Sequence, residues 1–281
     1  MTRNRSLNEN RNDFCVDGRI LPSLFVIGIQ KCGTSTLDVI LSKFRELTHG
    51  EKKEHHFFDD DFGNFDLKKY LKQFPNCKKN VVRSYDATPK YTMPITNAAE
   101  NIKRFYDKLG ILLNQLIFIA IVCPNSSRVP SGFHSRREKG NQGDSRFLNL
   151  TKRKFNEWFD WILEHPDHDI LPRGFYDQIF AKYFELFPES TFLLIDSQYA
   201  FAKMQNLGDF LAKELNFPER HIPNIHSNRG KVKKEELTEF NMERLNHFYS
   251  KHEEQFSTLI KFNKNVKTFP SNLTEFFDKW K

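Results

Sequence analysis

The chain has no long hydrophobic segment. Its longest wholly apolar run covers eight residues, Leu116 to Cys123, whereas a membrane-spanning helix needs about 20. The first residues, Met1 to Arg11, are polar and lack the basic-then-apolar order of a secretory signal. We therefore expect no membrane association, and a cytoplasmic location is the simplest expectation. A Golgi-lumenal or secreted catalytic fragment would look nearly the same.

Cysteine is scarce. The chain contains four, Cys15, Cys32, Cys77 and Cys123. Their spacing is irregular and includes no Cys-x-x-Cys pair, which argues against both a disulfide scaffold and a zinc site. The adjacent His55 and His56 cannot easily point at one ion, so no metal is expected. A reducing compartment follows from this interpretation.

Internal repeats and motifs of nucleic-acid-binding modules are also absent. The chain nevertheless carries a net charge of +7, which suits a polyanionic ligand such as a nucleotide or a sulfated glycan. We expect the surface of an anion-binding enzyme, with no nucleic-acid partner. With 281 residues, of which 38% are hydrophobic, the chain can bury the core of one large α/β domain.

Short apolar runs alternate with amphipathic segments along the chain. Strands are predicted at residues 24–29, 81–84, 116–122 and 191–195, and helices at 34–44, 65–74, 98–113, 128–139, 152–164, 174–187, 201–215 and 236–262. This alternation predicts a central parallel β-sheet flanked by helices. We expect a flexible tail at residues 1–20, a single domain at 21–265 and a C-terminal tail at 266–281.

A glycine-containing turn follows the first apolar run. Residues 28–37 read Gly-Ile-Gln-Lys-Cys-Gly-Thr-Ser-Thr-Leu. A strand that leads through such a turn into a helix forms a phosphate cradle, because the amides at a helix N-terminus favour an anion. In the Walker A motif lysine follows the second glycine, but here Thr34 has that place and the lysine lies earlier, at Lys31.

Four segments, within residues 22–262, resemble the PAPS-dependent sulfotransferases and especially their carbohydrate (heparan-sulfate-type) branch. The first is the turn just described, similar to that family's 5′-phosphosulfate loop. The others are Lys-Lys-Glu-His-His-Phe-Phe-Asp at 52–59, Arg128 to Ser131 after the third strand, and Ser-Asn-Arg-Gly-Lys at 227–231. The resemblance implies an enzyme that moves a sulfuryl group from PAPS to a hydroxyl of a carbohydrate or a small-molecule alcohol, with release of PAP. It implies a P-loop-like fold.

The first segment would hold the donor. Lys31 would stabilise the leaving phosphate as negative charge develops on it, which makes it both a catalytic and a donor-binding candidate. Hydroxyl and amide groups of the following residues would bind the 5′-phosphate; these are Cys32, Gly33, Thr34, Ser35 and Thr36. The alternative is an ordinary Ser/Thr-capped helix with an exposed lysine.

The second segment would hold the acceptor. The resemblance places the catalytic glutamate at Glu54, which would take the proton of the acceptor hydroxyl. His56 would act beside it as a hydrogen-bonding or proton-handling partner, and Lys53 would orient Glu54 or bind an anionic acceptor. The alternative is a solvated charged loop with Phe57 and Phe58 in the core.

The third and fourth segments would bind the 3′-phosphate and close the site. Arg128 and Ser131 could bind that phosphate by charge and hydrogen bonds, but Cys123 stands where the family has an arginine. Arg136 or the late segment could supply the positive charge that the missing arginine would provide. In that late segment the candidates are Arg229, Gly230 and Lys231. The alternative for Arg128 is an ordinary start of a basic helix.

Two further segments are candidates for acceptor binding. Residues 86–91 read Asp-Ala-Thr-Pro-Lys-Tyr and resemble a family stretch with lysine at the position of Ala87, so Lys90 could substitute from a different direction. His134 belongs to a basic cluster that either lines an acceptor groove or is a solvated helix face.

Two other functions stay open on the sequence. A P-loop kinase-like phosphotransferase would use Asp196, at the end of the last apolar run, to hold magnesium. A non-catalytic polyanion-binding module would explain Ala87 and Cys123, although Lys31 and Glu54 argue for catalysis.

Overall fold

The computed structural model describes residues 14–59, 66–77, 83–166, 168–225, 235–277 and 280. A six-stranded sheet forms its centre, with the order β4-β5-β3-β6-β7-β8 and all neighbouring strands parallel. The strands are β3 (Pro22–Gly28), β4 (Leu47–Thr48), β5 (Arg83–Asp86), β6 (Ile117–Val122), β7 (Thr191–Asp196) and β8 (Val266–Phe269). The predicted parallel sheet flanked by helices is confirmed.

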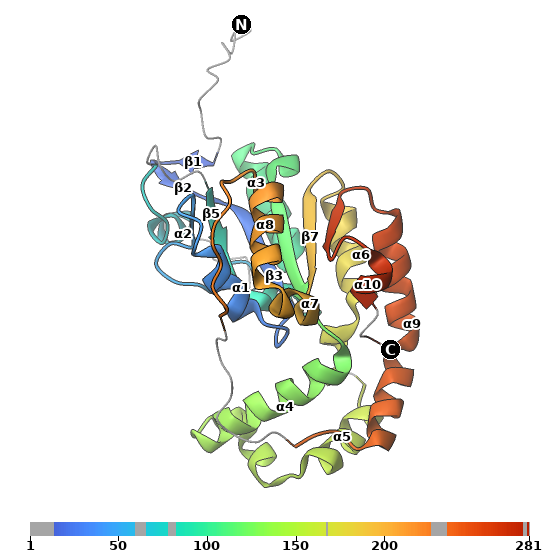
Figure 1. The fold of residues 1–281 in the computed structure, drawn as a ribbon. Helices are drawn as coiled ribbons and strands as arrows, with labels where there is room; N and C mark the ends of the chain where they lie inside the picture. Colours follow the sequence, from blue (N-terminus) through green and yellow to red (C-terminus); the bar gives the residue numbers. More distant parts are fainter. Residues whose placement is uncertain are drawn as a thin grey trace, which may run out of the picture.

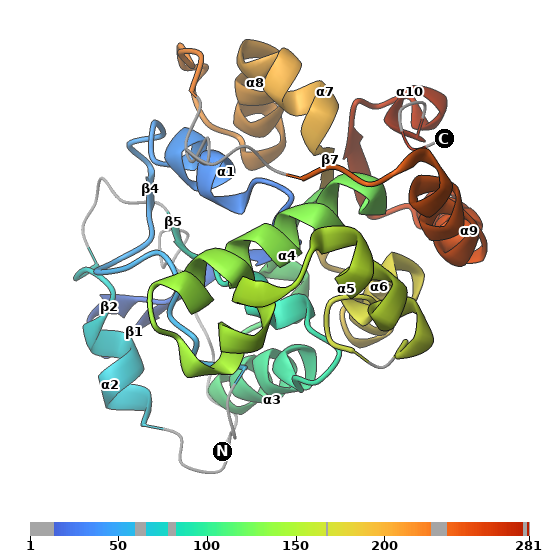
Figure 2. The same ribbon diagram turned by 90° about the horizontal axis from the view of Figure 1, so that it is seen from below.

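Helices cover both faces of this sheet (Figures 1 and 2). They are α1 (Thr34–Leu41), α2 (Leu67–Lys72), α3 (Ala98–Leu109), α4 (Asn125–Asn141), α5 (Phe155–Glu164), α6 (Tyr176–Leu186), α7 (Ser197–Ala202), α8 (Met204–Leu215), α9 (Glu239–Phe262) and α10 (Leu273–Phe277). Two hydrophobic clusters hold helices to the sheet: α3 and α6 pack on one face, and α1 and α8 on the other. A third cluster joins α4, α5 and α9. None of the helices among the described residues is long and apolar enough to cross a membrane.

The central strands explain why the sheet is buried on both sides. Every residue of β3 and β6 is buried, as a parallel strand between two helical layers requires. Figure 2 looks at the carboxyl ends of these strands, where α4 crosses beneath the sheet. In doubly wound sheets, ligands bind at this edge.

Several element boundaries differ from the predicted ones. Strand β5 begins at Arg83 and extends to Asp86, beyond the predicted end at residue 84. Helix α4 begins at Asn125, directly after Pro124, and continues through Pro130, although proline removes a backbone donor there. The segment predicted as one helix at 201–215 is divided into α7 and α8 at Lys203.

Ordered elements also occur in the segments predicted as tails. The strands β1 (Cys15–Val16) and β2 (Arg19–Ile20) form an antiparallel hairpin. At the other end, β8 pairs with β7 and completes the edge of the central sheet. The C-terminal tail predicted to begin at residue 266 is therefore wrong over β8. Two- and four-residue strands are too short to show a clear alternation of apolar residues.

The cysteines form two disulfides, which corrects the expectation drawn from their spacing. Cys15 is bonded to Cys77, with 6.0 Å between their Cα atoms, and Cys32 to Cys123, with 5.3 Å. Pairing depends on distance in the fold, and the fold brings together residues 62 and 91 positions apart in the chain. The argument for a reducing compartment therefore fails.

We predict that the Cys15–Cys77 bond stabilises the N-terminal hairpin against the rest of the domain. The double substitution Cys15→Ser/Cys77→Ser should lower the free energy of unfolding by ~2–4 kcal/mol, because the bond closes a long loop in the unfolded chain. Urea unfolding without reductant measures this change. An unchanged midpoint and slope would contradict it.

Candidate active site

The turn between β3 and α1 is shaped by two glycines. Gly33 has φ +107 and caps α1 in a left-handed conformation that residues with a Cβ rarely adopt. A Cβ at Gly28 would lie 2.5 Å from Oγ1 of Thr92, so only glycine permits this close approach. The turn is thus fixed by its own backbone and by the segment that follows β5.

The phosphate-cradle candidates lie together at this turn. Lys31 is exposed and has φ +76, Thr34 and Thr36 are buried, and Ser35 is half-buried at the first turn of α1. The amides of Thr36 and Leu37 donate to the carbonyl of Gly33. The first amides of a helix have no carbonyl partner within it, so the start of α1 offers donors to an anion.

A chain of alternating charges runs from this turn across the loop at residues 53–59. Nζ of Lys53 lies 3.2 Å from Oγ of Ser35 and 3.2 Å from Oε1 of Glu54. Nε2 of His56 lies 3.4 Å from Oε2 of Glu54, and its Nδ1 lies 2.7 Å from Oδ2 of Asp59. The chain ends at Lys90, whose Nζ is 3.4 Å from the same oxygen of Asp59. The structure therefore places four predicted site residues in one charge chain: Lys53, Glu54, His56 and Lys90.

These contacts set the protonation states. The hydrogen bond from His56, supported by Lys53, lowers the pKa of Glu54 although burial opposes the shift. Hydrogen bonds to Asp59 and then to Glu54 raise the pKa of His56 to about 9. For Asp59, burial alone would raise the pKa, but His56 and Lys90 bring it below its usual value. At neutral pH Glu54 is therefore an ionised carboxylate beside an imidazolium.

The charged loop is supported from below by Asp86 and Thr88. Oγ1 of Thr88 donates to Asp86 over 2.6 Å and accepts the amides of His55 and His56 at 3.0 and 3.3 Å. Asp86 is fully buried and also accepts a hydrogen bond from the hydroxyl of Tyr91 at 2.6 Å. The loop that carries Glu54 is thus attached to the carboxyl end of β5.

Arg128 has a different environment from the one predicted for a phosphate ligand. Its side chain is 1% exposed, and its guanidinium donates to Oδ1 of Asn125, to the carbonyl of Ile170 and to the hydroxyl of Tyr249, over 2.8 to 3.1 Å. These bonds join α4 to the segment before α6 and to α9. The geometry therefore favours a structural role for Arg128, while Ser131 lies half-buried one turn further along α4.

The disulfide Cys32–Cys123 joins the turn to the end of β6. Both cysteines are 3% exposed, and the hydroxyl of Tyr176 donates to the carbonyl of Cys123 at 2.9 Å. Cys32, predicted among the donor-binding residues, is therefore a bonded half-cystine. Cys123 occupies the position where the resembled family has arginine, so a covalent bond replaces a positive charge at this place.

A second arginine reaches the turn from the other side. Arg173 lies in the short 3-10 helix η5 (Pro172–Gly174) and donates to the side chains of Gln30 and Asp169. Arg136 of α4 also donates to Asp169, at 2.6 and 2.7 Å. Burial lowers the pKa of Arg173 to about 10, so it stays cationic at neutral pH.

The other predicted residues lie elsewhere. Nε2 of His134 is 2.9 Å from the carbonyl of Glu235, and its ring packs near Phe155 of α5. That places His134 in the α4–α5 layer and apart from the charge chain. Arg229, Gly230 and Lys231 lie outside the described residues.

The proposed magnesium ligand of a kinase has a structural task. The side chain of Asp196 accepts the amide of Tyr199 at 2.7 Å, as the N-cap of α7. Its other oxygen accepts Nε1 of Trp280 at 3.0 Å. Both contacts are internal, which favours a capping role over metal binding.

Sequence reasoning missed four contributors to the site: Asp59, Thr88, Gln30 and Arg173. Asp59 was visible three positions after His56, within the resembling segment. The role of Thr88 depends on two backbone amides from another loop, and the bond between Gln30 and Arg173 joins residues 143 positions apart. No local pattern reports such contacts.

Comparison with known proteins supports the fold. No family model matches the chain, and no curated protein matches it. Among solved structures, a sulfotransferase from Alicyclobacillus acidocaldarius is similar, with a TM-score of 0.64 and 19% sequence identity. The similarity covers 86% of this chain and 96% of that one. At this identity the likeness establishes a shared fold, that of a sulfotransferase.

We predict that His56 titrates near pH 9 because Asp59 and Glu54 stabilise its charged form. Its pKa lies above the ordinary value of 6.5, so its stabilising effect is complete below that value and is lost as the pH rises through about 9. Proton NMR of the imidazole ring measures the midpoint. Asp59→Asn should move it down toward 6.5, whereas Asp107→Asn on the exposed part of α3 should leave it unchanged. Equal midpoints in all three proteins would contradict the assignment.

We predict that the hydroxyl of Thr88 stabilises the loop. Thr88→Val would remove one hydrogen-bond donor from the buried Asp86 and the shared acceptor of two backbone amides, and the free energy of unfolding should fall by ~1–3 kcal/mol. Thr88→Ser keeps the hydroxyl and should lose less. Chemical unfolding of the two variants compares them directly, and a Thr88→Val variant that is at least as stable as Thr88→Ser would contradict the role of the hydroxyl.

Proposed function

We propose that this protein is a sulfotransferase that moves a sulfuryl group from PAPS to an acceptor hydroxyl and releases PAP. One observation carries the proposal: Nζ of Lys53 contacts both Ser35 of the phosphate-binding turn and Glu54 of the charged loop. A carboxylate therefore lies one side chain away from the anion-binding start of α1. In-line transfer between a donor phosphate and a hydroxyl needs a base at this place.

The chemistry assigns one task to each residue. Glu54 takes the proton of the acceptor hydroxyl as its oxygen forms a bond to sulfur. The bond between sulfur and the bridging oxygen breaks, its electron pair stays on the phosphate of PAP, and Lys31 stabilises that charge. His56 orients Glu54 and balances its charge, and Asp59 keeps His56 protonated. No metal ion takes part in these steps.

For the nucleotide, we assign the 5′-phosphate to the start of α1, including Thr34, Ser35 and Thr36. Ser131 would contact the 3′-phosphate, and Arg128 would position α4 for that contact. Cys32 would contribute its backbone and its bond to Cys123. We retain Arg229, Gly230 and Lys231 as proposed contacts that close the site. Lys53 and Lys90 flank the space for the acceptor, and His134 would contact the acceptor only if the acceptor is an extended molecule.

The two disulfides bear on the compartment. Disulfides persist in oxidising environments and are rare in the cytosol. We therefore favour a lumenal or secreted setting over the cytoplasmic location expected from the sequence. In that setting the sequons at Asn149 and Asn272 would be accessible to glycosylation.

The proposal predicts that Glu54→Gln separates catalysis from donor binding. Loss of the base should lower turnover by ~10²–10⁴-fold, while the affinity for PAP stays close to that of the wild type. Release of PAP from PAPS in the presence of acceptor measures turnover, and calorimetry measures binding. Glu51→Gln, on the exposed side of the same loop, is the matched control.

Two results would redirect the assignment. Near-normal turnover in Glu54→Gln would remove Glu54 as the base. Failure of the wild type to bind PAP, together with activity on ATP and magnesium, would support the kinase alternative. Binding of PAP without turnover on any hydroxyl acceptor would support a non-catalytic module.

A further inference from the structure

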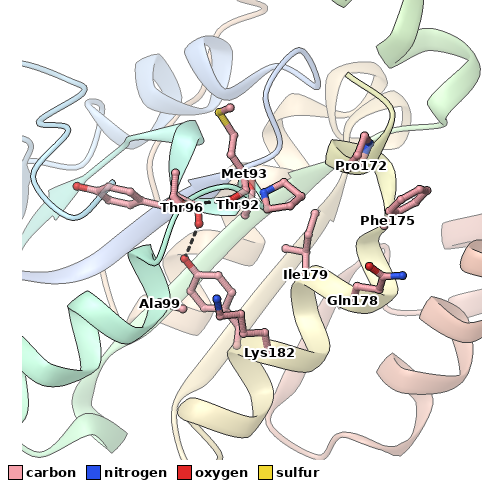
Figure 3. A pocket seen from close by; sticks show the side chains of 12 residues that line it. Thr92, Met93, Thr96, Ala99, Pro172, Phe175, Gln178, Ile179 and Lys182 are labelled. Atoms are coloured by element: carbon pink, nitrogen blue, oxygen red, sulfur yellow. Dashed lines mark hydrogen bonds between the residues drawn. The ribbon is translucent and has the colours of Figure 1, made fainter. Parts of the chain in front are cut away.

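A cavity of about 170 Å³ lies between the N-terminal turns of α3 and α6 (Figure 3). One wall is formed by η2 (Pro89–Thr92) and the residues directly after it, and the opposite wall by η5 and the first two turns of α6. Ala99, on the first turn of α3, closes one side. None of the contacts described so far assigns a ligand to this space.

Both walls of the cavity are attached to the catalytic turn. On one side, Thr92 packs directly on Gly28, at the end of β3. On the other side, Arg173, which follows the lining residue Pro172, is hydrogen-bonded to Gln30. Lys90, two residues before Thr92, reaches Asp59 of the charge chain. The walls of the cavity are therefore connected both to the turn and to the charge chain.

The polar groups of the lining are mostly occupied by internal bonds. The hydroxyls of Tyr91, Thr92, Thr96 and Tyr183 donate to Asp86, to the carbonyls of Pro89 and Met93, and to the carbonyl of Tyr91. Gln178 and Lys182 add two further polar groups to the lining, and the rest is apolar, with Met93, Pro94, Phe175 and Ile179 as the main contributors. An apolar cavity of this kind gains by enclosing an apolar group.

The charges around the cavity do not match a polyanion. Lys182 is the one cation among the lining residues, and its Nζ lies 2.6 Å from Oε1 of Glu100. Next to the lining residue Pro94, the side chain of Ile95 is 75% exposed, so the nearby surface is apolar as well. The one cation of the lining is thus already paired with a carboxylate, so the cavity offers a sulfated polysaccharide little uncompensated positive charge.

We propose that this cavity binds the ring of the acceptor, so that the acceptor is a small phenol or a similar ring-bearing alcohol. A cavity of about 150 Å³ holds one benzene ring, and the present volume is close to that. The proposal rests on the proposed function and narrows it: the apolar ring enters between α3 and α6 and leaves its hydroxyl toward Glu54. It makes Ala99, Met93 and Ile179 determinants of acceptor specificity.

A pair of matched variants tests the cavity. Ala99→Leu adds a branched side chain to the space, whereas Ala181→Leu makes the same change on the exposed face of α6. The probe is 4-methylphenol, and saturation-transfer NMR measures its binding without any donor. Ala99→Leu should weaken binding about tenfold or more, equivalent to ~1.4 kcal/mol, while Ala181→Leu should have no effect. Calorimetry with PAP and the melting temperature establish that both variants are folded.

A third variant tests the same idea in the opposite direction. Met93→Ala enlarges the cavity and should allow 2-naphthol to bind more tightly than in the wild type, even if Ala99→Leu fails to fold. Equal effects of Ala99→Leu and Ala181→Leu, or no binding of 4-methylphenol to the wild type, would overturn the proposal. So would turnover with glycans that 4-methylphenol does not inhibit.

The outcomes separate this inference from the proposed function. Binding of 4-methylphenol that depends on Ala99, without PAP binding or turnover from PAPS, would leave the ring site established and the sulfotransferase activity refuted. Turnover from PAPS with acceptors that do not depend on Ala99 or Met93 would leave the activity established and the ring site refuted.

Discussion

The hydroxyl of Thr88 is the contact on which the rest of the candidate site depends. It donates to Asp86 at the carboxyl end of β5 and accepts the amides of His55 and His56. His55 and His56 directly follow Glu54 in the chain. The two hydrogen bonds to the Thr88 hydroxyl therefore fix the position of the charged loop relative to the sheet. The position of Glu54 relative to the start of α1 is therefore a property of the core and does not depend on the loop alone. Burial raises the pKa of Asp86 because the charged carboxylate is removed from water. Hydrogen bonds from three hydroxyl groups offset this free-energy cost.

The charge chain above this support explains how a half-exposed carboxylate stays ionised and oriented. Glu54 lies between Lys53 and His56, and His56 lies between Glu54 and Asp59. Each charge is balanced by the next, so the cluster needs little help from solvent. Exposed ion pairs contribute little to stability, and the value of this cluster lies in fixing protonation states. A histidine with a pKa of about 9 is protonated at neutral pH, which agrees with the proposal that Glu54, and not His56, takes the proton of the acceptor.

Much of the fold could be predicted from the sequence, because β3, β6 and β7 are continuous apolar runs and α3, α5, α6 and α9 show clear helical spacing. The cradle was visible for the same reason: Gly33, Lys31 and three hydroxyl residues stand together in the chain. The remaining features depend on contacts that have no local pattern. Arginine is a residue type expected to bind phosphate, but the guanidinium of Arg128 is hydrogen-bonded to Asn125, Ile170 and Tyr249 in the fold. The cysteine pairs, the edge strand β8 and the bond between Arg173 and Gln30 are likewise products of the tertiary structure.

Cys32 and Cys123 acquire a meaning only as a pair. Taken separately, Cys123 is the loss of a basic group and Cys32 a small residue beside Lys31. Joined, they attach the turn between β3 and α1 to the end of β6, and under the proposed function they would hold two parts of the nucleotide site at a fixed separation. An arginine at position 123 would contribute charge to a phosphate, whereas the disulfide contributes preorganisation, which improves affinity by lowering the entropy lost on binding. Under the proposed function, the positive charge near this turn comes from Lys31, Lys53 and Arg173, which approaches from η5, together with the proposed contacts Arg229 and Lys231. The two requirements of the proposed donor site, cationic charge and a rigid backbone, would then be met by different residues.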